Sequence, residues 1–413
     1  MTDRRRKRIL LACFSCSPLW GSEPGVGWNW LKELSRLHDV TLVTHEFYRA
    51  HLEPALAEQP LEGVEVFYSG AWAAGRPYTT FLNSRLYYLW WQINLFFFVR
   101  RLVGTRPFDL IHHLTWGTVR FPSFLGFLGI PFVIGPLGGG DVAPRALLSG
   151  QPFVERAFEN IRSLSLKLFR LDAVTRAATS RARLIFCKTD ATMNCLPENL
   201  RSRAQLAFEI GTPPIANQVP KPVREAEAPL RLLFAGRLVG LKGVSIAIAA
   251  VDRLRTRGIE VSLDIAGDGP LRHHLARQIT DLHLTDHVRI LGMLPREELF
   301  LLYEAADVFV FPSLRDSSGN VILEALSRQL PVVCLDLAGP KYYVSPECGV
   351  VVSTVGLSRS AVEDALASAL SSLARDSERL ARLSRAALSH ARTQTWAYRV
   401  TTAYDRIAET LGW

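Results

Sequence analysis

Short apolar runs that end in turn residues recur along the chain. The first run, at 8–14, is followed by a glycine-bearing turn (WGSEPGVGW), an amphipathic pattern that predicts a helix over about 28–37, and a second run, VTLVT, at 40–44. Two further runs, DLIHHL and IPFVIGPLGGG, also end in turn residues. This order of strand, turn, helix and strand is typical of a parallel sheet whose strands are followed by loops at one edge.

A proline-rich segment separates this region from a second one with the same pattern. Residues 211–229 (GTPPIANQVPKPVREAEAP) contain five prolines, which disfavour both helix and sheet. Strands are then predicted in RLLFAGRL, VSLDIAGDGP, HVRILGML, DVFVFPS, LPVVCLD and GVVVS, and helical patterns follow after about Ser353. The expected fold class is therefore α/β, with two doubly wound domains at 1–212 and 230–394, joined by a linker at 213–229.

Composition and charge narrow the class of protein. The length of 413 residues exceeds what one core usually organises, and the hydrophobic fraction of 48% is that of a folded globular chain. The net charge of +9 favours anionic partners, namely phosphate-bearing ligands, acidic membranes or nucleic acid. Since the sequence shows neither a recognition-helix pattern nor an aromatic RNA-stacking motif, we do not expect nucleic-acid binding.

The cysteines and the N-terminal segment favour an intracellular protein. Cys13 and Cys16 form a C-x-x-C, but no second pair or His cluster lies at ligand spacing, so we expect structural cysteines in a reducing cytoplasm. The run RRRKR-ILLAC is similar to a signal peptide. Its apolar core is only about four residues long, whereas about 7–15 are needed, so we expect a solvated basic tail that leads into the first strand.

An aromatic segment at 86–99 (LYYLWWQINLFFFV) has two interpretations. It is too short to span a membrane and contains Gln92 and Asn94. It could lie on an anionic membrane surface, with arginines facing the lipid headgroups over 85–101, or it could pack as a very apolar helix inside the N-terminal domain. The flanking arginines are Arg85, Arg100 and Arg101.

The stretch at 307–339 carries the most informative chemistry. An apolar strand ends at Pro312, a polar loop contains Asp316, and a helix is predicted to begin near Gly319 and to carry Glu324. A helix N-terminus offers unpaired N–H groups and a positive dipole end, which suit a pyrophosphate. A carboxylate within the same helix can accept hydrogen bonds from a ribose diol.

Two further turns follow successive predicted strands. AGRLVGLKG, at 235–243, places Arg237 and Lys242 in a glycine-rich turn, where two cations can neutralise a leaving diphosphate. AGDGP, at 266–270, is a tight turn. Because the carboxyl ends of parallel strands meet at one edge of a sheet, these turns and the loop around Asp316 are expected to form one ligand crevice.

In combination these motifs resemble the donor half of the family 4 retaining glycosyltransferases of GT-B fold. The resemblance covers about 230–353 strongly; the N-terminal half matches more loosely, through the first glycine turn and the D-x-x-H at 109–112. The tail at 395–413 is similar to the family's closing helix, which crosses back to the first domain. The resemblance implies two Rossmann-like domains that face each other across a cleft.

The resemblance also implies roles for individual residues. Arg237 and Lys242 match the pair that holds the donor diphosphate, and Glu324 matches the acid that contacts the ribose. Asp316 matches the acid beside the transferred sugar, which is normally Glu and one methylene longer. Ser22 and Glu23 replace the commoner paired glycines of the first loop. Further donor contacts are implied for Gly21, Gly25, Gly236, Gly267, Met293, Ser317, Ser318, Gly319 and Asn320.

The histidines and a third glycine loop are open to two interpretations each. His112 and His113 are predicted to end the strand DLIHH and face the cleft, but the second histidine of the family's H-x-H is Leu114 here. One of the two could bind the transferred sugar, with His113 preferred over His112, or both could be structural. The loop PLGGGDVAP, at 136–144, could line the acceptor side or form a connection.

The expected reaction is transfer of a hexose from a UDP- or GDP-sugar to a hydroxyl, with retention by same-face substitution. No D-x-D triplet occurs, so neither a metal nor another cofactor is expected. The expected acceptor is a lipid-linked or polysaccharide glycan in bacterial surface-polysaccharide assembly, at the inner face of the cytoplasmic membrane. Alternatives are a nucleotide-sugar epimerase or sugar phosphorylase of the same fold, and a catalytically silent binding subunit.

Overall fold

The computed structural model describes residues 5–70, 81–169, 172–216, 219–225 and 227–413, without the side chains of 81–85 and 167–169. By contacts, the chain forms two compact units. Unit 1 consists of Met1–Gly140, Leu164–Ile210 and Trp396–Trp413, and unit 2 of Asp141–Ser163 and Gly211–Thr395.

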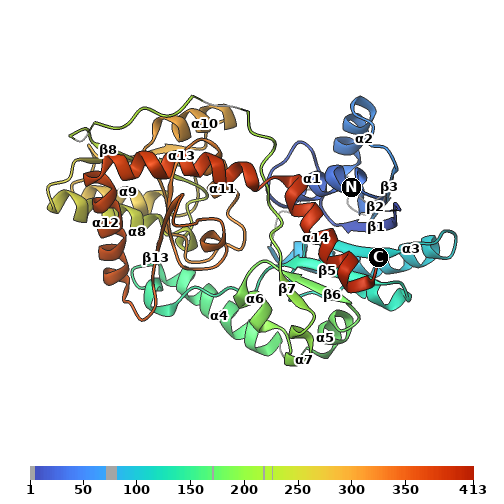
Figure 1. Ribbon diagram of the computed structural model, residues 1–413. Helices are drawn as coiled ribbons and strands as arrows, with labels where there is room; N and C mark the ends of the chain where they lie inside the picture. Colours follow the sequence, from blue (N-terminus) through green and yellow to red (C-terminus); the bar gives the residue numbers. More distant parts are fainter. Residues whose placement is uncertain (1–4, 71–80, 170–171, 217–218, 226) are drawn as a thin grey trace. The chain divides into compact units, whose positions relative to one another are not determined.

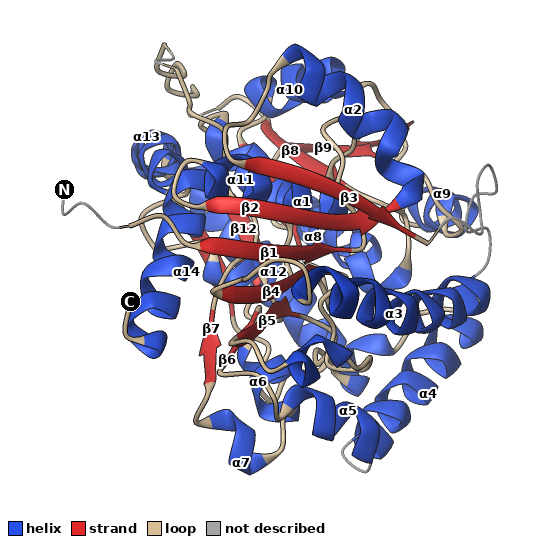
Figure 2. Ribbon diagram, turned by 90° about the vertical axis from the view of Figure 1, so that its right-hand side faces the viewer, coloured by secondary structure: helices blue, strands red, loops and turns tan. Residues whose placement is uncertain are grey.

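Unit 1 is built on a seven-stranded parallel sheet in the order β3-β2-β1-β4-β5-β6-β7. Its central strands are buried along almost their whole length, as expected for strands covered on both faces. Figure 2 shows β3, β2, β1 and β4 lying side by side. The strands are β1 (Arg8–Cys13), β2 (Asp39–His45), β3 (Val64–Ser69), β4 (Leu110–Thr115), β5 (Phe132–Leu137), β6 (Leu184–Cys187) and β7 (Ala204–Leu206).

Helices cover this sheet. The last helix of the chain, α14, belongs to unit 1 and packs against α1 (Figure 1). The α-helices of unit 1 are α1 (Ser22–Ser35), α2 (Arg49–Glu58), α3 (Phe81–Val103), α5 (Ala173–Thr179), α6 (Asp190–Cys195), α7 (Glu198–Arg201) and α14 (Trp396–Leu411); its short 3-10 helices are η1 (Glu46–Tyr48) and η3 (Phe124–Leu128).

Helix α1 begins six residues before the predicted start, so the predicted glycine turn is instead its first turns. The glycines there serve close packing rather than a turn. A Cβ on Gly25 would lie 2.7 Å from the carbonyl oxygen of Trp20, and one on Gly27 would lie 2.4 Å from that of Ser15. The preceding loop therefore packs directly on the helix backbone, which only glycine permits.

Unit 2 contains a six-stranded parallel sheet in the order β10-β9-β8-β11-β12-β13, in agreement with the six predicted strands. The strands are β8 (Leu230–Ala235), β9 (Val261–Ala266), β10 (Val288–Gly292), β11 (Val308–Phe311), β12 (Val332–Leu335) and β13 (Gly349–Val352). The helices are η4 (Arg145–Leu148), η5 (Gly240–Lys242), α8 (Val244–Thr256), α9 (Arg272–Asp281), α10 (Arg296–Ala305), α11 (Asn320–Ser327), η6 (Pro340–Tyr342), α12 (Arg359–Arg375) and α13 (Ser377–Thr393).

One segment does not lie in the domain predicted for it. Residues 141–163 precede β6 in the sequence and were expected in the N-terminal domain, but they pack on unit 2. Buried Gln151 donates a hydrogen bond to the carbonyl of Gly240 (3.1 Å), and Arg359 donates one to the carbonyl of Ser149. Helix α4 (Phe153–Phe169) then leads from unit 2 back to unit 1.

Helix α3 contains the aromatic segment at 86–99. It buries one face in the core of unit 1, where Trp91, Leu95 and Val99 are inaccessible to solvent. Within the described residues, no helix is both long and apolar enough to cross a membrane.

Candidate active site

The glycine-rich turn after β8 packs directly on the end of β11. The dihedral φ is +152° at Gly236 and +70° at Gly243, conformations that favour glycine. A Cβ on Gly243 would lie 1.9 Å from the carbonyl oxygen of Pro312. The amide of Leu314 also donates to the carbonyl of Leu241 at 2.8 Å. Two loops that are separate in sequence are therefore held together by their backbones.

The turns after β8, β9 and β10 are joined in the same way. A Cβ on Gly267 would lie 2.0 Å from the carbonyl oxygen of Gly236, so neither turn has room for a side chain between them. The amide of Gly267 donates to the carbonyl of Gly292 at 2.7 Å. The predicted gathering of strand ends at one sheet edge is thus present in unit 2.

Lys242 and Asp316 meet where these loops converge. The Lys242 ammonium donates to the Asp316 carboxylate and lies 5.3 Å from the centroid of the Phe311 ring. The side chain of Lys242 is 25% exposed and that of Asp316 is 16% exposed, so both are partly shielded from solvent. Arg237, the second predicted cation, is on the same turn and exposed to solvent.

The Asp316 carboxylate also caps the start of α11. One of its oxygens accepts hydrogen bonds from the amides of Ser318 (3.2 Å) and Gly319 (3.1 Å). Gly319 is the N-cap of α11, with φ of +76°. The donors that the sequence predicts for an anionic ligand, the lysine and two amides, are therefore bound to Asp316. A phosphate that reaches them has to compete with this carboxylate.

Glu324 lies further along α11, beside α10. Its carboxylate accepts a hydrogen bond from the hydroxyl of Tyr303 (3.4 Å) and lies 3.6 Å from the guanidinium of Arg296. Burial raises the pKa of Glu324. Met293, in the turn after β10, is 76% exposed. Glu324 thus keeps an acceptor group at a partly exposed position, as a ribose contact requires.

The structure places His112 and His113 differently from the prediction. Strand β4 continues to Thr115, so both histidines lie within it and neither side chain is accessible beyond 2%. The His112 ring bonds the hydroxyl of Tyr404 (3.0 Å) and the carbonyl of Gly135 (2.8 Å). The prediction that they end the strand is wrong, and their surroundings favour the structural interpretation.

His113 faces the other side of the sheet. Its Nε2 lies 3.2 Å from the hydroxyl of Tyr88 and 3.4 Å from the amide nitrogen of Gln92. Gln92, one of the two polar residues noted in the aromatic segment, also donates to Tyr88 at 2.7 Å. The polar residues of this segment therefore serve a buried hydrogen-bond group. A contact between either histidine and a sugar stays a prediction.

These buried histidines predict a pH dependence of stability. Burial lowers the pKa of His112 and of His113 to about 4, from an ordinary value of 6.5. Between these values the unfolded chain binds protons that the folded chain does not, so stability present above pH 6.5 is lost as the pH falls towards 4. Thermal melting between pH 7.5 and 4.5 measures this loss. We expect a shallower dependence for His113→Gln, and identical slopes would contradict the assignment.

The predicted glycines of the first loop have structural contacts. Gly21 is the N-cap of α1 and has open space where a Cβ would be, whereas Gly25 is buried against Trp20. Donor binding by either glycine stays a prediction.

A buried ionic group beside this loop was missed. The Lys188 ammonium lies 2.6 Å from the carboxylate of Glu209 and 3.3 Å from that of Glu23, which also accepts the amide of Trp116. Glu23, which replaces a glycine of the family's loop, thus has a structural partner. No signal in the sequence could have found this group, because Lys188 is 165 positions from Glu23.

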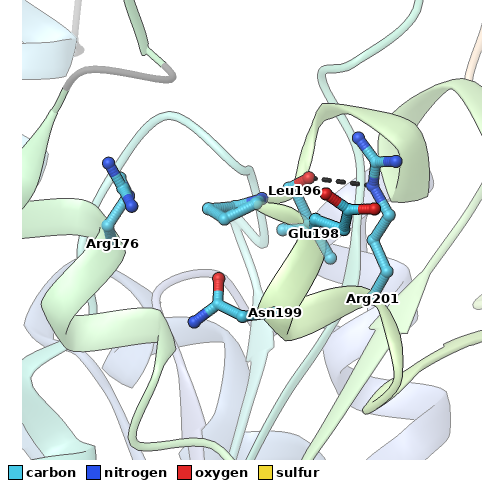
Figure 3. Close-up of a pocket in the computed structure, with 6 residues that line it drawn as sticks. Arg176, Leu196, Glu198, Asn199 and Arg201 are labelled. Carbon is cyan, nitrogen blue, oxygen red and sulfur yellow. Dashed lines mark hydrogen bonds between the residues drawn. The ribbon is translucent and has the colours of Figure 1, made fainter.

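A pocket of about 640 Å³ lies elsewhere on unit 1, between α5 and α7. Figure 3 shows Arg176 on one side of it and Glu198 and Arg201 on the other, with Asn199 between them. Arg201 donates a hydrogen bond to the carbonyl of Leu196, which fixes its guanidinium. None of these residues belongs to the predicted site.

The cysteines fit a structural role. Cys13 and Cys16 are free and buried, and desolvation raises the pKa of the Cys13 thiol to about 12. Within the described ranges, no group of three or more His, Cys, Asp or Glu side chains could hold a metal ion. Independence from metals stays a prediction.

Two parallel sheets with covering helices, and loops that gather at the strand ends of unit 2, define a two-domain α/β fold of the GT-B type. Residues 207–390 match the family model described as Glycosyl transferases group 1. The matched region is less than half of the chain and includes the turn at Lys242 and the loop at Asp316.

Curated relatives match part of the chain. The amylovoran biosynthesis glycosyltransferase AmsK of Erwinia amylovora is 35% identical over 117 residues, which is 27% of this chain and 29% of AmsK. The D-inositol 3-phosphate glycosyltransferase of Corynebacterium glutamicum (strain R) is 34% identical over 187 residues, 42% of this chain and 43% of that protein. The alignments thus span less than half the length of either relative.

A solved structure is similar over nearly the whole chain. The crystal structure of Anabaena HepE in complex with UDP and glucose has a TM-score of 0.57, at 18% sequence identity, and covers 98% of this chain and 100% of that chain. At this identity the similarity concerns the fold alone, and it agrees with the predicted fold class.

Proposed function

We propose that this protein is a retaining hexosyltransferase that uses a UDP- or GDP-sugar. The observation that carries the proposal is the convergence of Lys242, Asp316 and the start of α11 on one sheet edge of unit 2. A cation and helix amides together are suited to a pyrophosphate. The group 1 domain match supports the proposal, as does the HepE structure, which contains UDP and glucose.

The proposed chemistry is same-face substitution at the anomeric carbon. The bond from this carbon to the diphosphate oxygen breaks, while the acceptor oxygen forms its new bond on the same face. The acceptor proton passes to the departing phosphate oxygen. Arg237, Lys242 and the amides at the start of α11 stabilise the negative charge that develops on the diphosphate, so no metal is required.

We infer that Asp316 changes its hydrogen-bond partners during this cycle. Its carboxylate binds Lys242 and the α11 amides. When a diphosphate occupies these donors, we infer that the carboxylate turns to the hydroxyls of the transferred hexose. The short Asp side chain then favours a sugar that lies closer to the loop than a Glu would require.

A screen of nucleotide sugars tests the proposal. Thermal shift and mass spectrometry with UDP- and GDP-sugars identify the base and the sugar together. Transfer to an added glycan acceptor, with the anomeric configuration retained, supports the proposal. Conversion of the nucleotide sugar without an acceptor indicates an epimerase or phosphorylase, and binding without turnover indicates a silent subunit.

For the acceptor, we propose a lipid-linked or polysaccharide glycan, used at the inner face of the cytoplasmic membrane. The relative AmsK is named for amylovoran biosynthesis, which supports a polysaccharide product. Helix α3 supports a membrane location. Its exposed face carries four large apolar side chains spaced four, three and four residues apart, between 39% and 59% exposed: Leu86, Trp90, Ile93 and Phe97.

The charged residues nearest to this exposed apolar face in the sequence are arginines. The sequence contains no acidic residue between Glu65 and Asp109, but five arginines. Arg100 and Arg101 are exposed at the end of α3, whereas the side chain of Arg85 lies outside the described part. An apolar face bordered by cations matches an anionic bilayer surface.

Replacing Trp90 and Phe97 with serine is therefore expected to weaken binding to anionic liposomes by about tenfold or more, since two large side chains lose their apolar contacts. Sedimentation with vesicles of anionic and of zwitterionic phospholipid measures this binding. Trp91 is unsuitable for this test because it is fully buried.

Val174→Ser, at a position on α5 that is 58% exposed, is the matched control and should leave liposome binding unchanged. Nucleotide-sugar binding should be the same in all three proteins. If the unaltered protein does not sediment with anionic vesicles, the membrane proposal fails, while the proposed reaction is unaffected.

A further inference from the structure

The two residues on either side of Asp316 are both held by carboxylates from the 141–163 segment. The Ser317 hydroxyl donates to Asp141 at 3.0 Å. On the other side, the Arg315 guanidinium lies 3.3 Å from the carboxylate of Glu159. Ser317 is one of the predicted donor residues, whereas Asp141, Glu159 and Arg315 are not. The two carboxylates lie 176 and 156 positions earlier in the chain than their partners.

Both carboxylates are buried. Asp141 and Glu159 are each only 2% exposed, so little solvent competes for their partners. The hydrogen bond from Ser317 to Asp141 and the ion pair between Arg315 and Glu159 are both stronger where the surroundings exclude water. The contacts to Ser317 and Arg315 are therefore suited to fixing the conformation of the loop.

A third residue, Arg162, links Asp141 and Glu159. Arg162 donates to the backbone carbonyl of Asp141 at 3.0 Å and lies 3.5 Å from Glu159. The group of Asp141, Glu159, Arg162 and Arg315 carries two negative and two positive charges and is thus balanced. It forms one connected unit beside the Asp316 loop.

The same segment also contacts the other donor loop. Gln151 donates to the carbonyl of Gly240, and a Cβ on Gly240 would lie 2.4 Å from the Gln151 amide oxygen. Gly240 is two residues before Lys242. One segment thus contacts the neighbours of both partners of the Lys242–Asp316 pair: the backbone of Gly240 before Lys242, and the side chains of Arg315 and Ser317 beside Asp316.

We propose that Asp141 and Glu159 are positioning residues that orient Asp316 towards the transferred sugar, through Ser317 and Arg315 respectively. The inference rests on the proposed function, because it concerns the sugar part of the same donor site. Since the diphosphate is assigned to Lys242, Arg237 and helix amides, loss of either carboxylate should affect the binding of the sugar more than that of the nucleotide.

Isothermal titration tests this with two pairs of probes, UDP-glucose with UDP and GDP-mannose with GDP. For Asp141→Asn and Glu159→Gln, we expect affinity for the bound nucleotide sugar to fall about tenfold and affinity for the matching nucleoside diphosphate to stay within about twofold. Turnover with an identified acceptor should show a lower kcat as well. Glu155→Gln, in the first turn of α4, is the matched control and should behave as the unaltered protein.

Ser317→Ala tests whether Asp141 acts by positioning the loop or by direct contact with the ligand. This variant leaves the ion pair between Arg315 and Glu159 intact. If Asp141 acts through Ser317, the double variant with Asp141→Asn should bind the nucleotide sugar no more weakly than the weaker single variant. Additive losses, or equal losses of nucleotide sugar and nucleoside diphosphate, overturn the inference. If the unaltered protein binds none of the four probes, the donor assignment in the proposed function fails instead.

Discussion

Replacing Lys242 with methionine is expected to lower kcat/KM for hexose transfer by about a thousandfold. One oriented cation or hydrogen-bond donor at a developing negative charge contributes about 10²–10³ in rate. In this protein we expect the loss of rate to exceed that for removing a single donor. The Asp316 carboxylate would remain beside the negatively charged diphosphate without its lysine. Initial rates with the donor found by screening measure the effect.

The double variant Lys242→Met with Asp316→Asn separates the two contributions. Removing the charge of Asp316 should restore part of the lost affinity for the nucleoside diphosphate, measured by titration. Lys242→Arg should retain part of the activity, since it keeps the charge but not the compact ammonium. Lys32→Met, on α1, is the control. Transfer by Lys242→Met at more than a tenth of the normal rate would contradict the assigned role.

Replacing Lys188 with methionine is expected to destabilise unit 1 by about 3–5 kcal/mol, because it leaves two carboxylates without their cation. The side chains of Lys188 and Glu209 are 8% and 5% exposed, so solvent cannot substitute for the lost partner of Glu209, whereas Glu23 is 32% exposed. The carboxylates of Glu209 and Glu23 raise the pKa of Lys188, which keeps it charged at neutral pH. Thermal melting should show the transition of unit 1 about 10 °C lower.

The companion variant Lys188→Met with Glu209→Gln tests the cause of this loss. Removing the charge of Glu209, which is left unpaired in the single variant, should restore part of the melting temperature. If the single variant were destabilised by a packing defect alone, this second change would restore nothing. Strand β6 ends one residue before Lys188. Hydrogen exchange in this strand should rank the unaltered protein, the double variant and the single variant in the same order of stability. Equal melting of the single variant and the unaltered protein would show that the ion pairs contribute nothing.

The sheet of unit 2 and its candidate site were accessible from the sequence because the information is local. Each predicted residue follows an apolar strand within a few positions, and parallel strands bring their carboxyl ends to one edge. Lys242 and Asp316 are 74 positions apart, but both belong to such strand ends. The pattern therefore predicted their convergence without any knowledge of side-chain packing.

The parts that sequence reasoning missed depend on distant partners. His112 was expected at the end of its strand, facing the cleft, with a sugar contact and a structural role both open, and its ring bonds Tyr404, 292 positions away. The early start of α1 depends on contacts between glycine backbones and the preceding loop. Nothing in the pattern around Asp141 and Glu159 indicates that they contact the Asp316 loop, because buried carboxylates and exposed ones look alike in a sequence.

The assembly of unit 1 from three separate stretches has a consequence for synthesis. Tyr404, which hydrogen-bonds His112 in the middle of the first sheet, lies in α14. A ribosome has therefore released nearly the whole chain before this unit can complete its packing, although its strands emerge first. A fragment that stops after β7 exposes the surface of α1 that α14 covers. Because each unit consists of separate stretches of the chain, no single truncation yields either unit intact.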